Sequence, residues 1–572
     1  MLEIVSSKGA LELAPKEEIA WEEIFHVINQ NADLKSWRFN LPKSAKNKAQ
    51  LASFIDIDAK RRVEISLEVE VLLFGQEWSR GPLFFLDENE SAWEVSFAGK
   101  MGYLLQKLTD LSLQQFTYPN ANPVNIYDHA LTINSQTDSD YVFAPVDLPS
   151  LQGDVWWPAQ INSVVVDTNG DLDRFVEFWR HFEADDWSDS TEYNELDQVR
   201  FNKYYYEALA GTLAGQSPDT HPAKWQQITQ GPIKRYNPMV PFLKVFKILQ
   251  HIAAEKGFSL SGELMENTEI QQLVFFNTVC LNTMEENVPG TVLPNTIIEY
   301  KRHLPDVEVV ELLRQIALFF NQRIDYSNND NTLRFIPRTE SLVSPIGHSL
   351  RDKVIRMEVI HREKRTYHLK YSYLQSDAEL ASSTWTGSLE GIESELGSET
   401  LNSSFSTLAM RYGFNEVDPA WREYPGDSRM DANYPGFWWR PVSSLPLNAD
   451  VPQQFLLWRK FHYYLAGSWD NDPELPQVSS DLNFTNFEGY SQTLLWKGSG
   501  GLYEVYWKEF LYSLSLAKVL RVFFLLDGQS WNRSQLLGRQ SLREWICLLE
   551  TVKLNIKQDD QAVIAEAQVL KI

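Results

Sequence analysis

Two acidic segments of this chain carry oxygen-bearing side chains at spacings that suit a divalent cation. In the first, Asp167-Thr-Asn-Gly-Asp-Leu-Asp173, these side chains recur every second residue. A calcium loop of the EF-hand type needs glycine at its sixth position and an acidic residue at its twelfth, and Leu172 and Phe178 stand there. The second segment is Glu183-Ala-Asp-Asp-Trp-Ser-Asp189. We expect a turn at the first and a solvated loop at the second, and we predict no metal site.

Catalytic signatures are weaker still. Ala98-Gly-Lys-Met-Gly102 has a Gly-Lys pair but lacks the upstream glycine and the Ser/Thr of a phosphate-binding loop. The chain has no G-x-S-x-G elbow and no H-E-x-x-H motif. His251 lies beside the apolar stripe of a predicted helix, so we expect a packed or rim histidine and not a ligand. We therefore predict no enzyme, with no catalytic or cofactor-binding residues and no cofactor.

Aromatic clusters are the other candidates for binding chemistry. They are Trp156-Trp157, Tyr204-Tyr-Tyr206 and Phe437-Trp-Trp439, all in segments without clear periodicity. Exposed aromatic side chains in such segments serve partner or sugar binding. Packing of their own long loops is the first expectation, with subunit contact and sugar stacking as the alternatives.

Composition narrows the class of partner. The chain has 572 residues, a net charge of −25, 43% hydrophobic and 13% aromatic residues. This length predicts several packed domains. The acidic charge argues against a groove that wraps nucleic acid, although an acidic channel would let DNA slide through without sticking.

Cysteines and termini carry no further signature. Cys280 and Cys547 both lie in apolar runs and are expected in the core, with no disulfide framework. The first residues lack the charged and apolar regions of a signal peptide, and no apolar run reaches the length of a membrane span. We expect a chain made in a cytoplasm, with no stable membrane insertion.

The periodicity of the chain predicts α+β architecture in four parts. Residues 1–115 read as a β domain with strands at 63–71, 78–86 and 93–97 and short helices at 44–51 and 101–108. Residues 116–235 read as an irregular acidic and aromatic insertion that runs over the surface. Residues 236–345 read as a small α/β module, and residues 346–572 as a second β domain with a loop insertion at about 376–452.

The α/β module has the clearest pattern. One helix is predicted over 241–257, with Pro241 in its first turn and Gly257 just past its end. A second helix is predicted from Asp306, as N-cap, through Phe320. A β-hairpin over 323–336 follows, and the second β domain then begins with strands at 354–360 and 367–373.

An aromatic helix is predicted near the C-terminus, over 502–516. Its apolar residues fall on one stripe, and Glu504 and Lys508 are spaced for an ion pair on the other side. The glycines at 500 and 501 end the preceding segment, and 519–526 reads as a buried strand. We expect this helix to support the sheet of the second β domain. The stripe consists of Tyr503, Tyr506, Trp507, Phe510, Leu511 and Leu514.

A series of segments in this order resembles a family of tail hub proteins, also called tail-tip or baseplate hub proteins, from phages and prophages of Bacteroidetes-type bacteria. The insertions match poorly, and the chain lacks a long C-terminal extension with a lytic or fibre domain. The matching segments are 36–48, Gly81-Pro-Leu83, Trp93-Glu-Val-Ser-Phe97, Tyr141-Val-Phe-Ala-Pro-Val146, 237–249, 311–320 and 502–511.

The resemblance implies a homotrimer in which each subunit contributes two tube-like antiparallel β-barrel domains bracketing the α/β module. The resulting pseudo-hexameric ring would join the tail tube to the tip and conduct DNA through its lumen. Distal tail or tail tube proteins, the tape measure protein, and tip fibre or spike proteins would be its partners. The expected location is the tail tip of the virion, after assembly in the bacterial host cytoplasm.

Two other functions remain as alternatives. A carbohydrate-binding surface or receptor-recognition protein would use the aromatic clusters, although the missing export signal argues against it. A glycosidase would need two carboxylates that meet in a cleft, and 77 acidic residues leave that pairing undefined.

Overall fold

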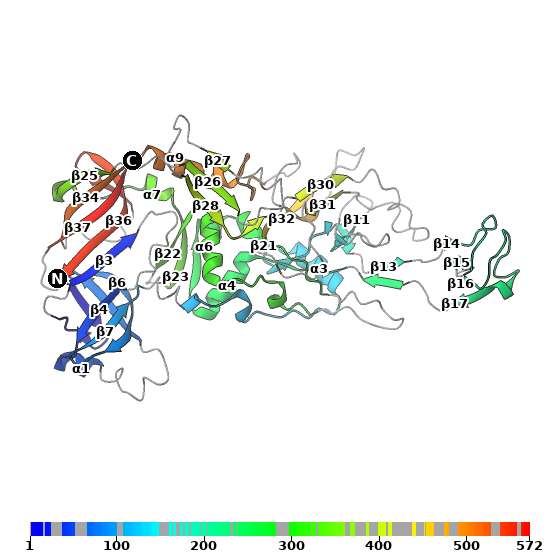
Figure 1. Cartoon of the computed structure of the whole chain (residues 1–572), viewed down its shortest axis with the longest axis horizontal. Helices are drawn as coiled ribbons and strands as arrows, with labels where there is room; N and C mark the ends of the chain where they lie inside the picture. Colours follow the sequence, from blue (N-terminus) through cyan, green and yellow to red (C-terminus); the bar gives the residue numbers. More distant parts are fainter. Residues whose placement is uncertain are drawn as a thin grey trace.

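In the computed structural model the molecule is elongated (Figure 1). Sheets from both chain ends lie at one end, helices α4 (Val245–Lys256) and α6 (Val309–Phe319) in the middle, and a small sheet at the far end. The described part is mixed α+β, mostly sheets with few helices, and none of its helices has the length and apolar character to cross a membrane. The described residues are 2–14, 18–24, 37–51, 66–99, 104, 107–147, 160–162, 164–166, 172–175, 178–181, 185–195, 197–202, 204–228, 233–236, 238–281, 297–327, 330–360, 366–371, 385–387, 398–407, 410–414, 437–441, 451, 454–462, 474–479, 490–527, 538–557 and 562–572.

The N-terminal sheet has six strands in the order β2-β1-β5-β6-β7-β4. Its hairpin between β6 and β7 turns at Asn89, whose side-chain oxygen accepts from the backbone N–H groups of Ser91 (2.9 Å) and Ala92 (2.8 Å). The strands predicted in this region are confirmed where they are described. Their bounds are β1 Leu2–Ser6, β2 Gly9–Ala10, β4 Trp37–Pro42, β5 Ser66–Leu73, β6 Gln76–Glu88 and β7 Ala92–Phe97.

The short helix predicted at 44–51 is α1, Ala45–Leu51. Ser44 caps it, because its hydroxyl accepts from the backbone N–H of Asn47 at 3.2 Å. The buried Asn47 amide exchanges two hydrogen bonds with the backbone of Glu12, at 2.7 and 2.8 Å. The helix is thereby fixed to the segment after β2. The helix expected at 101–108 falls largely outside the described residues.

The C-terminal sheet has seven strands in the order β24-β35-β36-β37-β34-β25, with β3 (Glu18–Ile24) also paired to β36. Strand β3 comes from the N-terminal segment and makes seven antiparallel Cα pairs with β36, from Glu18↔Lys557 to Ile24↔Thr551. The predicted strand at 519–526 is β34, but its side chains alternate between buried and exposed positions. The remaining bounds are β24 Ile346–Ser349, β25 Val354–Ile360, β34 Lys518–Asp527, β35 Arg539–Leu542, β36 Trp545–Lys557 and β37 Ala562–Lys571.

The two sheets share one hydrophobic core, which we call the terminal core. Alternate residues of β1, β5 and β7 contribute to it from the N-terminal sheet, and alternate residues of β34 and β37 contribute from the C-terminal sheet. Its fully or nearly fully buried members include Ile4, Leu41, Leu73, Leu83, Val95, Val522, Phe524, Leu526, Leu549, Val552, Ala567 and Val569.

Closed barrels at the two chain ends are not observed. In the described residues each sheet is an open path of strands, from β2 to β4 and from β24 to β25. Buried residues of both sheets belong to the terminal core, so the two sheets are joined into one hydrophobic unit.

The central module contains the predicted helices and hairpin. Strands β22 (Gln322–Ser327) and β23 (Thr332–Pro337) form the hairpin, and β20 (Ser259–Gly262) pairs parallel to β23. Helix α4 ends at Gly257, whose φ of 75° confirms the left-handed position predicted for it.

Both helices of this module begin later than predicted. Strand β19 (Phe242–Leu243), paired with β8 (Tyr141–Val142), occupies the residues expected in the first turn of α4. Asp306 is not the N-cap of α6, because the backbone of Val307 and Val309 bonds to Leu113 and Leu111 and holds this segment extended. Backbone pairing thus replaces the first helical turn at both sites.

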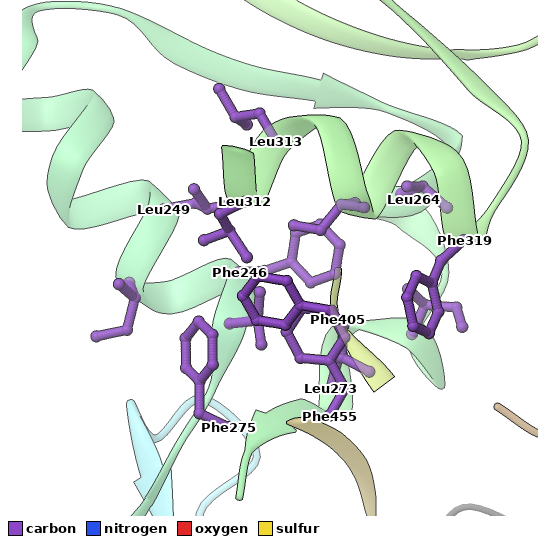
Figure 2. Close-up of a cluster of buried hydrophobic side chains, with 14 of the residues drawn as sticks. Phe246, Leu249, Leu264, Leu273, Phe275, Leu312, Leu313, Phe319, Phe405 and Phe455 are labelled. Atoms are coloured by element: carbon purple, nitrogen blue, oxygen red, sulfur yellow. The ribbon is translucent and has the colours of Figure 1, made fainter. Parts of the chain in front are cut away.

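The core of the central module, here the central cluster, joins α4 and α6 to later segments (Figure 2). Phe455 of β32 (Gln454–His462) stacks on Phe405 with ring centroids 4.5 Å apart, and it also meets the rings of Phe319 and Phe275. Phe405 lies inside the stretch 376–452 that we expected to be a loop insertion. The sequence gives no apolar period there, so its burial was not predictable.

Residues 116–147 also differ from the expected surface insertion. They contain a helix that was not predicted, α3 (Ile126–Ser135), capped by Asn125, whose side chain accepts from the N–H of Tyr127 at 2.9 Å. Tyr118 and Phe143 of this stretch are buried in the central cluster. The four-part division of the chain itself stays a prediction.

The aromatic helix near the C-terminus is confirmed, with a wide π-helical turn at Tyr503–Trp507 that leads into α9 (Lys508–Leu516). Lys508 Nζ lies 2.8 Å from Glu504 Oε2, as predicted. The buried stripe packs into the central cluster, where Trp507 Nε1 donates to Leu318 O at 3.2 Å. The helix therefore anchors on the end of α6, and supporting the C-terminal sheet is only part of its role.

Gly500 fits this anchor for a steric reason. Its φ is 74°, and a Cβ atom there would lie 2.1 Å from the carbonyl oxygen of Ser491. Only glycine allows the segment before the helix to approach this closely.

Replacement of Trp507 by alanine should destabilise the chain by about 3–5 kcal/mol, because it leaves a cavity in the central cluster. The denaturant midpoint of the purified variant measures this loss. Tyr512→Ala on the exposed side of the same helix is the matched control and should stay within about 0.5 kcal/mol of the unchanged chain. Equal midpoints for both variants would contradict the anchoring role.

Candidate partner surfaces

The polar group around Asp140 connects several segments of the central module. Asp140 Oδ2 accepts from the Tyr300 hydroxyl at 3.0 Å and lies 2.8 Å from His251 Nε2. The imidazole of His251 meets the rings of Tyr118 and Tyr300 edge to face, and these two rings stack on each other. His251 is thus a packed histidine at the rim of α4, which is the position that its helical spacing indicated.

The electrostatics of this group follow from burial. Burial, reinforced by the Asp140 carboxylate, raises the pKa of Tyr300 and of Tyr141 well above the ordinary tyrosine value. Both hydroxyls therefore stay protonated, and that of Tyr300 donates to Asp140. The arrangement joins the turn after α3 to α4 and to the 3₁₀ turn Tyr300–His303, which is a structural task.

Lys244 extends the same group into the interior. Only 1% of this residue is exposed, its backbone N–H donates to Asp140 O at 2.8 Å, and Nζ donates to Thr137 O at 3.3 Å. Burial, together with the neighbouring charge of Lys247, lowers the pKa of Lys244 to about 8. Lys247 in turn forms an ion pair with Asp138 at the surface.

The acidic segments do not form a cation site in the part of the chain that is described. The Asp186 carboxylate is held by the Arg200 guanidinium through two hydrogen bonds, one of 2.9 Å from Nη2. Asp173 forms an ion pair with Arg174. Residues 167–171 and 182–184 lie outside the described residues, and within those residues no group of three or more His, Cys, Asp or Glu could hold a metal ion.

The Gly-Lys segment at 98–102 continues a strand where it is described. Ala98 N–H donates to Pro82 O at 3.1 Å, so the segment extends the ladder between β6 and β7. A Cβ on Gly81 would lie 2.1 Å from Ala98 O, which explains a glycine at that position. The lysine and the following residues of the motif lie outside the described residues.

The aromatic run at 204–206 lies in the small sheet at the far end of the molecule (Figure 1). Tyr206 packs on a local core of Val199, Ala208 and Trp225, whereas Tyr204 is 56% exposed. The run therefore both packs its own segment and presents one ring to solvent. The strands, in sheet order, are β14 Asp185–Asp186, β15 Gln198–Phe201, β16 Tyr204–Ala208 and β17 Trp225–Ile228.

The other two aromatic clusters are described only in part. Trp156 and Trp157 lie outside the described residues. The backbone of residues 437–439 belongs to β31 (Phe437–Pro441), which pairs with β30 (Met410–Phe414). A ladder of five Cα pairs fixes this backbone, where the sequence suggested a loop.

A second apolar stripe lies on the aromatic helix, on the side that faces away from the central cluster. Val505 is 46%, Tyr512 53% and Leu516 60% exposed, at helical spacings of seven and four residues. We call these three residues the outer stripe. Sequence reasoning assigned only the buried stripe of this helix, although the spacing of the outer residues was readable.

Both cysteines are buried, as predicted. Burial raises the pKa of the Cys280 thiol, and it raises the pKa of the Cys547 thiol to about 12. Thiols of this kind are poor nucleophiles at neutral pH, so they serve packing.

Comparison with known proteins finds matches among solved structures only. No protein-family model matches it, and no curated protein does. Among solved structures, the 43 kDa tail protein of prophage MuSo2 from Shewanella oneidensis aligns with 100% of this chain and 96% of its own, at 10% identity and a TM-score of 0.34. The tail protein from Neisseria meningitidis MC58 aligns over the same shares, at 9% identity and a TM-score of 0.29. TM-scores of this size do not establish a common fold.

The stability of the chain should rise between pH 7.5 and 9.5 because of Lys244. The unfolded chain keeps the lysine proton up to about pH 10.5, whereas the folded chain releases it above about pH 8, so unfolding takes up a proton in this window. We expect a gain of about 1–2 kcal/mol, measured by denaturant unfolding at the two pH values. Above pH 10 the raised tyrosine pKa values act in the opposite direction.

The variant Lys244→Met should lose this pH-dependent gain. Lys46→Met on the exposed surface of α1 removes the same charge and should keep it. A gain of equal size in the Lys244 variant would show that another group causes the dependence.

Proposed function

We propose that this chain is a structural subunit of a phage tail, the hub protein that joins the tail tube to the tip. The observation that carries the proposal is the pair of β-sheets from the two chain ends on one side of an α/β module. A hub subunit needs two β units per chain, because three subunits then supply six units around one axis. The ordered series of hub-like sequence segments supports the same assignment.

The proposed ring differs from the first expectation in how each subunit supplies its β units. The sheets share one core within a chain, so they would enter the ring as a joined pair and not as two separate barrels. Closure of the tube would then come from contacts between subunits. Strand β25, whose described ladder pairs only with β34, leaves an edge that a neighbouring chain can extend.

The acidic charge fits a conduit. With a net charge of −25 the chain repels phosphate, so DNA would pass through the lumen without stable binding. Distal tail or tail tube proteins, the tape measure protein, and tip fibre or spike proteins would be its partners. The proposed location is the tail tip of the virion, and the proposed role involves no catalysis.

A glycan-binding role is the second candidate, because Tyr204 presents an exposed ring at the far end of the molecule. Sugar rings stack on such side chains.

The purified chain, alone and mixed with neighbouring tail proteins, should give a particle of three times the chain mass by light scattering. Electron micrographs of this particle should show a threefold ring with a central opening, and a glycan array should show no signal. A monomer under all these conditions that binds sugars, and loses them in the Tyr204→Ala variant, would overturn the hub assignment in favour of the second candidate.

A further inference from the structure

We propose that the two sheets from the chain ends form a single cooperative unit, the terminal lock, which opens and closes separately from the central cluster. The terminal lock consists of the six-stranded N-terminal sheet and the seven-stranded C-terminal sheet. The inference concerns conformational coupling within one chain and does not rest on the proposed function.

The first observation is that buried residues of both sheets belong to one continuous hydrophobic cluster. Leu41, Leu73 and Val95 of the N-terminal sheet are fully buried in the same core as Val522 and Phe524 of the C-terminal sheet. A sheet with one apolar face is stable only when another layer covers it. Separation of the sheets would therefore expose the part of this cluster that joins them, so the opening of one sheet should destabilise the other.

The second observation is the exchange of a strand between the sheets. Strand β3 follows β1 and β2 in sequence, yet its backbone pairs along seven residues with β36. The chain then returns to the N-terminal sheet at β4. Detachment of the N-terminal sheet would pull on this ladder, so the hydrogen bonds couple the sheets in addition to the apolar contact.

The third observation is that the central cluster is built from different residues. Its helices α4 and α6 and the stripe of the aromatic helix contain no member of the terminal core. Among the described buried residues, the C-terminal sheet contributes Val519, Leu548 and Leu570 to the central cluster, and the N-terminal sheet contributes none. The N-terminal sheet should therefore follow the C-terminal sheet and not the helices.

Hydrogen exchange of the full chain, read by mass spectrometry of peptides, tests this coupling in the variant Phe524→Ala. We expect amides of β5 and β7 to exchange on the order of 100-fold faster, by the same factor as amides of β36 and β37. Amides of α4 should change less than about threefold, because the cavity lies outside the central cluster. Val522→Ala, which removes two methyl groups, is the milder second variant, with a change on the order of 10-fold.

The matched control is Phe246→Ala, since Phe246 is fully buried in the central cluster. It should speed exchange in α4 and α6 and leave β5 and β7 unchanged. Unchanged exchange of β5 and β7 in Phe524→Ala would show that the sheets open independently. An equal rise in α4 would show that the whole chain opens as one unit. Either result would overturn the terminal lock.

Discussion

The contact that joins the two ends of this chain is the terminal core, which contains buried residues of both the N-terminal and the C-terminal sheet. The two halves of the terminal core are separated by 253 positions of sequence, from Phe97 to Leu350. Among the described residues neither sheet closes into a barrel. The same contact brings the two chain ends together at one end of an elongated molecule and leaves the segments between them to extend away (Figure 1).

The central module has a hydrophobic core of its own, because its helices contribute no residue to the terminal core. Its helices bury their stripes against segments from three later parts of the chain, among them Phe405, Phe455 and Trp507. The aromatic helix joins both units, since its stripe lies on α6 while its last turn leads directly into β34. Polar contacts then fix the periphery of the module, as Asp140 does for the turn after α3.

The residues that first suggested chemistry are in part held by contacts within the chain. Asp186 is hydrogen-bonded to Arg200, and His251 packs against two tyrosine rings. What faces outward is a set of surfaces suited to assembly: the outer stripe, the edge of β25 and the ring of Tyr204.

The sequence by itself determined the local elements, because their causes are local. Period-two alternation defined β5, apolar stripes at helical spacing defined α4, α6 and the aromatic helix, and Gly257 marked a helix end through its own conformational freedom. Helix starts at Pro241 and Asp306 were wrong, since backbone pairing with distant segments competes there with the first helical turn. The open strand paths of the two sheets in the described residues, the strand exchange of β3 and the burial of Phe405 were decided only by the tertiary structure. These features depend on which apolar surfaces contact each other in the folded chain. Residue periodicity predicts an apolar surface, but it does not predict which distant segment packs against that surface.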